Sequence, residues 1–220
     1  CTNSQPSAPK VSRIALVLCT MTGAVRYSQV VMRASLASDV ADTLSRVSDE
    51  HPAFSRATRP ADRTVRLGEQ VSEVYDVWVP SAAIGTTVVL IHGGFWRARY
   101  DRHHLEPLAC ALARDGFHVA NIEFPRVGMP GGGWPGMGQA VVSRVEAVAA
   151  DPEVPDRLAL VGHSAGGHLA LWLASAGRSP TVSRVVALAP AVPLMEVHTR
   201  RLSHGAAQEL MGCPPEQAPD

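Results

Sequence analysis

The chain has 220 residues, of which 46% are hydrophobic and 18% are charged, as is ordinary for a globular protein with one sizeable core. Its 20 basic and 20 acidic residues cancel, so no global field attracts nucleic acid or an anionic membrane, and we expect neither as a partner. The four cysteines stand at positions 1, 19, 110 and 213, with no C-x-x-C spacing. We therefore expect neither a disulfide framework nor a zinc site, and a cytoplasmic location.

Residues 1–58 are interpreted as an extension that precedes the folded core. Residues 1–34 have no steady hydrophobic period, and we expect them to be disordered. Residues 35–47 carry apolar side chains at helical spacing and predict an amphipathic helix. The apolar run 14–19 is far shorter than the ~20 residues that span a bilayer.

The sequence begins with Cys1 rather than Met, which leaves two interpretations of its start. We favour an incomplete or over-extended reading frame whose true start is Met21 or Met32. The alternative is a processed lipoprotein, because a polar Thr/Asn/Ser/Gln/Pro tract follows Cys1.

From residue 59 onward, short apolar runs alternate with segments of helical periodicity. The runs predict strands over 64–67, 74–79, 86–91, 117–124, 158–161 and 185–189. The periodic segments predict helices over 101–114, 139–150 and 165–176, with Gly116 and Gly177 as stops and a partly helical segment from 194. This order predicts one α/β domain over 59–220, with a mostly parallel sheet and helices on both faces.

The strand over 158–161 leads into Gly162-His163-Ser164-Ala165-Gly166, a G-x-S-x-G motif followed by a helix. A serine at such a tight strand-to-helix turn is typical of a nucleophile elbow, because the turn pushes the hydroxyl out above the sheet. Glycines are needed there because side chains on either side of the serine would collide. The alternative is a glycine-rich connection with an incidental serine. We predict that Ser164 is a nucleophile.

A second glycine motif, His92-Gly93-Gly94-Phe95-Trp96, follows the strand over 86–91. Parallel strands end at the same edge of a sheet, so this loop and Ser164 are expected to lie together. Gly93 and Gly94 lack side chains, and their N–H groups can therefore approach a substrate oxygen closely. Together with the N–H of Ala165 at the start of the next helix, they form the predicted oxyanion hole.

The segments HGGFW at 92–96 and GHSAGGHLA at 162–170 resemble the α/β-hydrolase superfamily, most of all the kynurenine formamidase (arylformamidase) and related esterase group. The resemblance implies the α/β-hydrolase fold and catalysis without a cofactor. It also implies that Ser164 is the nucleophile and that the oxyanion donors are those named above. An acid should follow the next strand, and a histidine the last one.

That acid and histidine are expected beyond residue 220, because 220 − 164 leaves 56 residues after the serine and two further strands should carry them. We therefore interpret the chain as C-terminally incomplete. Alone it is expected to be close to inactive, since loss of a triad base costs about 10⁶-fold in kcat. On this interpretation the strand over 185–189 is an unpaired, aggregation-prone edge.

The chain itself offers five downstream candidates for the acid and the histidine: Glu196, Asp220, His168, His198 and His204. We expect His168 to pack locally on its helix, and His198 and His204 to be surface residues. Glu196 would serve as the acid only if this protein departs from its relatives, and Asp220 is a chain end.

Several residues near the motifs could either take part in the reaction or have a structural role only. His92 is expected to brace the oxyanion loop through hydrogen bonds rather than act as the base. Phe95, Trp96 and Trp134 are candidates for a substrate pocket, and ordinary loop packing is the alternative. A further pair, Arg97 and Arg126, either meets a substrate carboxylate or is solvated.

No metal site is expected, because the adjacent His103 and His104 cannot share a helical face with His92 as ligands. The leading hypothesis is thus a serine hydrolase that cleaves a small ester or aryl formamide through an acyl-enzyme. The alternatives are a general carboxylesterase of the feruloyl or acetyl type and a non-catalytic relative that binds a small molecule. The oligomeric state is left open.

Overall fold

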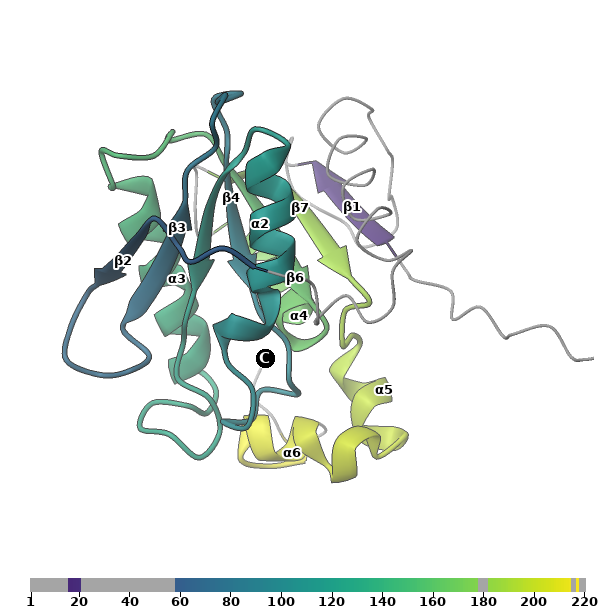
Figure 1. Ribbon diagram of the computed structural model, residues 1–220. Helices are drawn as coiled ribbons and strands as arrows, with labels where there is room; N and C mark the ends of the chain where they lie inside the picture. Colours follow the sequence, from purple (N-terminus) through teal and green to yellow (C-terminus); the bar gives the residue numbers. More distant parts are fainter. Residues whose placement is uncertain (1–15, 21–57, 178–181, 215–216, 218–220) are drawn as a thin grey trace, which may run out of the picture.

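The computed structural model describes residues 16–20, 58–177, 182–214 and 217 (Figure 1). Within them, seven strands form one sheet in the order β1-β7-β6-β4-β5-β3-β2. The strands are β1 (Leu16–Thr20), β2 (Arg63–Arg66), β3 (Val74–Trp78), β4 (Thr87–Ile91), β5 (His118–Ile122), β6 (Leu158–His163) and β7 (Val182–Leu188). The helices are η1 (Arg102–Leu105), α2 (Glu106–Arg114), α3 (Gly136–Ala149), α4 (Ala165–Ser175), α5 (Leu194–Thr199), η2 (Leu202–His204) and α6 (Ala206–Met211).

The centre of the sheet is parallel. Strands β5, β4, β6 and β7 run side by side in the same direction. Antiparallel strands flank them, with β1 on β7 and the hairpin β2–β3 on β5. The strands alternate along the chain with helices that cover both faces, so the predicted α/β-hydrolase fold is confirmed.

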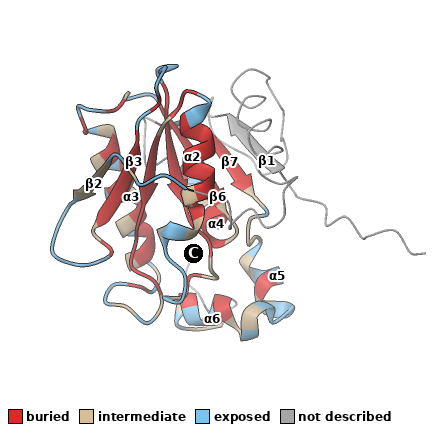
Figure 2. Ribbon diagram, viewed as in Figure 1, coloured by how far each residue is buried: buried red, intermediate tan, exposed pale blue. Residues whose placement is uncertain are grey.

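Two hydrophobic cores lie on opposite faces of the sheet, because successive side chains of a strand point to opposite sides. Val88 and Leu90 of β4 join the core under α2, whereas Val89 and Ile91 join the core under α3 and α4. All five residues of β4 are buried, which explains why the central strands read as continuous apolar runs (Figure 2).

The N-terminal extension differs from its prediction at residues 16–20. These were expected to be disordered, but they form β1, which pairs antiparallel with β7 from Leu16 opposite Leu188 to Thr20 opposite Arg184. The predicted unpaired edge at 185–189 is therefore wrong, because β1 satisfies the hydrogen-bonding groups along that side of β7. The helix predicted over 35–47 lies outside the described residues.

The helix predicted over 101–114 is divided into η1 and α2. Asp101 caps η1 by accepting a hydrogen bond from the backbone N–H of His103, and Pro107 lies in the first turn of α2, where its missing N–H is tolerated. Gly116 and Gly177 have φ values of +95° and +61°, so both end their helices in the left-handed conformation as predicted. No helix in the described ranges is long and apolar enough to cross a bilayer.

The elements that follow β7 lie at the carboxyl ends of the parallel strands. In Figure 1, the β7 arrow points toward the end of the sheet where α5 and α6 lie. This C-terminal segment, residues 194–211, is joined to the core under α3 and α4 by Val197, Ala206, Ala207 and Leu210. It therefore packs on the edge where the sequence places the site.

Candidate active site

Ser164 occupies the one-residue corner between β6 and α4. Its backbone is strained, with φ 53° and ψ −114°, a combination that is rare for a residue with a side chain. The neighbouring glycines are required by close contacts. A Cβ on Gly162 would lie 2.2 Å from the oxygen of Gly166, and one on Gly166 would lie 2.0 Å from the oxygen of Ile91. The turn thus has the geometry of a nucleophile elbow.

The end of β7 holds the backbone of Ser164 in this strained form. The N–H of Ser164 donates to the oxygen of Leu188 at 2.8 Å. Its carbonyl oxygen accepts from the N–H of Ala191 at 3.0 Å and from the N–H of His168 at 3.1 Å. Hydrogen bonds on both sides of the corner therefore keep it fixed.

The loop after β4 lies directly against the elbow. A Cβ on Gly93 would be 3.0 Å from Cβ of Ser164 and 2.8 Å from the oxygen of His163. Ala165 is buried and is the first residue of α4, so its N–H has no acceptor within the helix. The structure therefore brings together Ser164, Gly93 and Ala165, and Gly94 follows directly with φ +110°.

This loop continues through two further residues in the left-handed region. Phe95 and Trp96 have φ values of 50° and 60°, which cost free energy for residues with side chains. Two backbone bonds hold the bend: Arg97 N–H donates to the oxygen of Gly94 at 3.1 Å, and Val127 N–H donates to the oxygen of Trp96 at 2.8 Å. These hydrogen bonds therefore fix the conformation of the loop.

His92 is fully buried at the start of the loop and is bonded at both ring nitrogens. Nδ1 lies 2.9 Å from the carbonyl oxygen of Gly93, and Nε2 lies 2.8 Å from Oε1 of Glu123. Its ring also stacks on Phe124, with centroids 4.3 Å apart. These contacts connect the loop to the end of β5.

Sequence reasoning missed Glu123. Its backbone follows β5, and its carboxylate also accepts from the N–H groups of Phe124 at 3.0 Å and Arg102 at 3.1 Å. Burial raises the pKa of Glu123, but the hydrogen bond and charge of His92 and the charge of Arg126 outweigh burial, so the pKa lies below its ordinary value. A carboxylate ending an apolar strand, at the same edge as Ser164, was the signal that could have found it.

The carboxylate of Glu123 belongs to a buried chain of charges that reaches the edge of the sheet. The Arg102 guanidinium lies 3.8 Å from Oε2 of Glu123 and 2.5 Å from the carboxylate of Asp76 on β3. Asp76 in turn accepts from the hydroxyl of Thr64 on β2 at 2.6 Å. The oxyanion loop is thereby connected through side chains to the hairpin β2–β3.

Two more histidines lie beside the loop. The ring of His104 is 5.7 Å from that of His92 and 6.2 Å from that of His163. Burial, together with the charges of His92 and His163, lowers the pKa of His104 to about 4, and burial also lowers the pKa of His163. Both rings are therefore neutral near pH 7.

The predicted aromatic pocket is only partly supported. Phe95 and Trp134 are half-buried, but Trp96 is buried in the core, and its ring meets the edge of His168 at 5.5 Å. Ordinary packing is thus the correct interpretation for Trp96. His168 therefore packs, although against the distant Trp96 rather than only on its own helix, and burial lowers its pKa to about 4.

Arg126 is buried rather than solvated, whereas contact of either Arg97 or Arg126 with a substrate carboxylate stays a prediction. Arg97 forms two hydrogen bonds with Glu209 of α6, at 2.7 and 2.8 Å, and a third with the hydroxyl of Ser203. Arg126 is buried, lies 3.5 Å from Glu123 and donates to the oxygen of Tyr100. These arginines hold the loop and the C-terminal segment.

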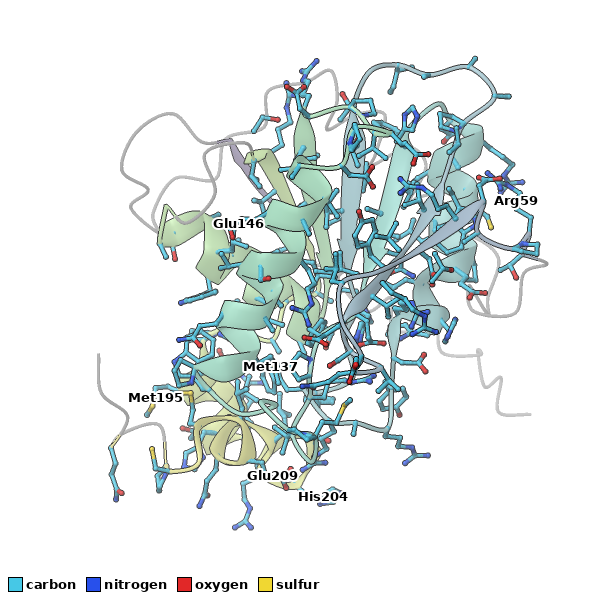
Figure 3. The ribbon with its side chains drawn as sticks, turned by 90° about the vertical axis from the view of Figure 1, so that its left-hand side faces the viewer. Arg59, Met137, Glu146, Met195, His204 and Glu209 are labelled. Carbon is cyan, nitrogen blue, oxygen red and sulfur yellow. The ribbon has the colours of Figure 1, made fainter. Side chains whose placement is uncertain are left out.

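The downstream triad candidates are placed as follows. Glu196 is exposed and pairs with Arg200 of its own helix at 2.5 Å. His204 is exposed, as expected, at the end of the molecule where Figure 3 also labels Glu209. His198 is half-buried rather than a surface residue, and Asp220 lies outside the described residues. An acid and a base beyond residue 220 remain predictions.

Over the described ranges, no group of three or more His, Cys, Asp or Glu side chains is arranged to hold a metal ion.

Residues 88–218 match the family described as the alpha/beta hydrolase family, and the chain belongs to that family. No curated protein matches the chain.

Solved structures with the same fold include two bacterial proteins. One is esterase B from Lactobacillus rhamnosis in a form inhibited by a tributyrin phosphonate, at 20% identity and a TM-score of 0.58, over 81% of this chain and 67% of that one. Another is a putative thioesterase from a Silicibacter species, at 22% identity and a TM-score of 0.53, over 87% of this chain and 70% of that one. The chain thus spans about two thirds of the length of these structures.

Proposed function

We propose that the protein is a serine hydrolase that cleaves a small ester or an aryl formamide through an acyl-enzyme formed on Ser164. The observation that carries the proposal is the contact between Gly93 and Ser164, where an added Cβ would lie only 3.0 Å from the serine Cβ. It puts a glycine loop beside a strained, half-buried serine at the start of a helix. Acyl transfer needs this combination.

In the proposed reaction, Oγ of Ser164 attacks the carbonyl carbon of the substrate while a base takes the hydroxyl proton. The carbonyl oxygen becomes an oxyanion, which the N–H groups of Gly93, Gly94 and Ala165 bind. Each such donor is worth about 3 kcal/mol of transition-state stabilisation. The bond to the amine or alcohol then breaks, the leaving group takes a proton, and water hydrolyses the acyl-enzyme.

A formamide substrate is favoured by one observation, which is that the HGGFW loop resembles that of kynurenine formamidases.

A general carboxylesterase is the second candidate. It is favoured by the structural similarity to esterase B from Lactobacillus rhamnosis. Both candidates use the same nucleophile and oxyanion donors, and they differ in the leaving group, which is an aromatic amine in one and an alcohol in the other.

The nucleophile is tested by treating the full chain with a fluorophosphonate and locating the adduct by mass spectrometry. We expect modification of the peptide that contains Ser164 and none in the Ser164→Ala variant. Ser175→Ala is the matched control, because Ser175 lies on the same helix and bonds only locally, to the oxygen of Trp172. An adduct on another residue, or none on a protein extended by the residues expected to carry the acid and the histidine, would contradict the proposal and favour a non-catalytic binding protein.

The substrate class is tested by comparing N-formylkynurenine with p-nitrophenyl acetate, each with the Ser164→Ala control. Faster serine-dependent turnover of the formamide supports an arylformamidase. Turnover of the ester alone favours the carboxylesterase. Robust turnover of either by this chain would also overturn the expectation that it is inactive without further residues.

A further inference from the structure

His92 is held between two hydrogen-bond acceptors, and this arrangement determines how many protons its ring carries. Nδ1 lies 2.9 Å from the carbonyl oxygen of Gly93. A carbonyl oxygen has no proton to give, so Nδ1 must donate. In a neutral ring, Nε2 would then turn a lone pair toward the carboxylate of Glu123 at 2.8 Å. That contact is favourable only if one of the two groups carries an additional proton.

The surroundings of Glu123 place that proton on His92. Oε1 of Glu123 also accepts from the N–H of Phe124 at 3.0 Å, and Oε2 accepts from the N–H of Arg102 at 3.1 Å. The guanidinium of Arg126 lies 3.5 Å from Oε1. All three neighbours are donors or positive charges, which favour an ionised carboxylate. Of the two rings beside His92, Phe124 carries no titratable group and His104 is neutral near pH 7.

The bond from His92 also sets the direction of the peptide between Gly93 and Gly94. This peptide is trans, and in a trans peptide the C=O and the N–H point in opposite directions. Holding the carbonyl oxygen of Gly93 on the imidazole therefore turns the N–H of Gly94 away from the His92 ring. Rotation of this peptide would break the bond at Nδ1.

We propose that His92 is a buried imidazolium held in that state by Glu123, and that this ion pair positions the N–H of Gly94 in the oxyanion hole. The role in the oxyanion hole rests on the proposed function, whereas the charge state does not. His92 and Glu123 are positioning residues, because they act through the peptide and take no proton from Ser164. Arg102 and Asp76 anchor the pair to the hairpin β2–β3.

The charge state is tested by NMR on the full chain labelled with ¹⁵N at histidine, near pH 8, where an ordinary histidine with a pKa of about 6.5 is neutral. The His92→Gln variant assigns the signal. We expect both ring nitrogens of His92 to be protonated in the native chain and only one in the Glu123→Gln variant. A native ring with a single protonated nitrogen would overturn the proposal by itself, even if the Gln variant fails to fold.

Two further variants separate this role from a merely structural one. Asp151→Asn removes another buried carboxylate that has no contact with His92 and should leave both protons in place. Glu123→Asp keeps the charge and should restore the second proton that Glu123→Gln removes. If Asp151→Asn also removed the second ring proton of His92, the specific pairing of His92 with Glu123 would be contradicted.

The positioning role is tested by the rate at which the fluorophosphonate modifies Ser164. We expect Glu123→Gln to slow modification about 10²–10³-fold, as loss of an oxyanion donor does, and Asp151→Asn to leave the rate unchanged. An unchanged rate in Glu123→Gln would overturn the positioning role while the proposed function stands. A doubly protonated His92 in a protein that is extended by the expected acid and histidine, but whose Ser164 never reacts, would instead leave the ion pair standing and overturn the proposed function.

Discussion

Two buried carboxylates, Asp151 and Glu123, are satisfied in different ways. Asp151, which follows α3, accepts from the Tyr75 hydroxyl and the Arg63 guanidinium, both at 2.7 Å. Glu123, which follows β5, accepts from His92 and from the backbone of Phe124 and lies close to two guanidinium groups. The exposed fractions are 8% for Asp151 and 1% for Glu123.

The two carboxylates differ in the protonation state of the side chain that each one binds. Asp151 binds a neutral phenol, whereas Glu123 binds a charged imidazolium in our proposal. Burial and the hydrogen bond to Asp151 raise the pKa of Tyr75, so this phenol keeps its one proton at any ordinary pH. Asp151 therefore joins α3 to β2 and β3 without depending on a titration. Glu123 is instead paired with His92, whose ring carries the additional proton in the ion pair that we propose. A buried carboxylate thus joins structural elements at Asp151 and adjoins the oxyanion loop at Glu123.

The largest expected effect comes from removing the carboxylate at the site. Glu123→Ala leaves His92, Arg102 and Arg126 as buried positive groups without their shared partner. Breaking a buried ion pair in this way costs about 3–5 kcal/mol of unfolding free energy. Urea denaturation at pH 7 measures the loss, and a loss below that of Asp151→Asn would reverse the ranking of the two carboxylates.

His168 is a third buried titratable group, and it differs from the two carboxylates because its Nδ1 has no hydrogen-bond partner among the described residues. Burial lowers its pKa from 6.5 to about 4, so the unfolded chain binds this proton more readily than the folded one. Stability is therefore complete above pH 6.5 and falls by about 3 kcal/mol as the pH drops toward 4, at 1.36 kcal/mol per pKa unit. His168→Phe should remove this part of the dependence.

The measurement is the free energy of unfolding in urea at several pH values between 4 and 7.5, for the native chain and the His168→Phe variant. The difference between the two curves isolates His168 from His104, which titrates in the same range. Parallel curves would show that His168 is not the source of the acid sensitivity.

A smaller effect is expected at the other carboxylate. Asp151→Asn keeps an acceptor for Tyr75 but loses the charge that pairs with Arg63, whose side chain is 27% exposed. We expect a loss of about 1–3 kcal/mol, typical of a buried hydrogen-bonded group. Thermal or urea unfolding measures the loss, and a slower reaction of Ser164 in this variant would show that Asp151 is coupled to the oxyanion loop.

The smallest effect is expected at the ion pair between Arg97 and Glu209, whose side chains are 29% and 45% exposed. Glu209→Gln should cost less than about 1 kcal/mol, and the cost should shrink in high salt because exposed charges are screened. Glu196→Gln, which breaks the exposed pair with Arg200, is the matched control. A cost well above that of the control would mean that the C-terminal segment depends on Arg97.

The sheet and the elbow could be predicted because their signals are local. A run such as TTVVLI, or a serine between glycines before an apolar helix, reports on backbone geometry within a few residues. Strand β1 could not be predicted, because its pairing with β7 joins segments about 165 residues apart in the chain. Glu123 and Arg102 were missed for the same reason: their contacts with His92 and Asp76 depend on the assembled sheet.

The bond between Arg97 and Glu209 joins two residues that are 112 positions apart. The strained bend at Phe95 and Trp96 is therefore held next to α6, which is synthesised long after the bend. On a ribosome that releases the chain from its N-terminus, the loop beside Ser164 gains this last support only after β6, α4 and β7 have emerged. Contacts of such long range close slowly and late in folding, so this loop should be among the last parts of the molecule to acquire its final shape.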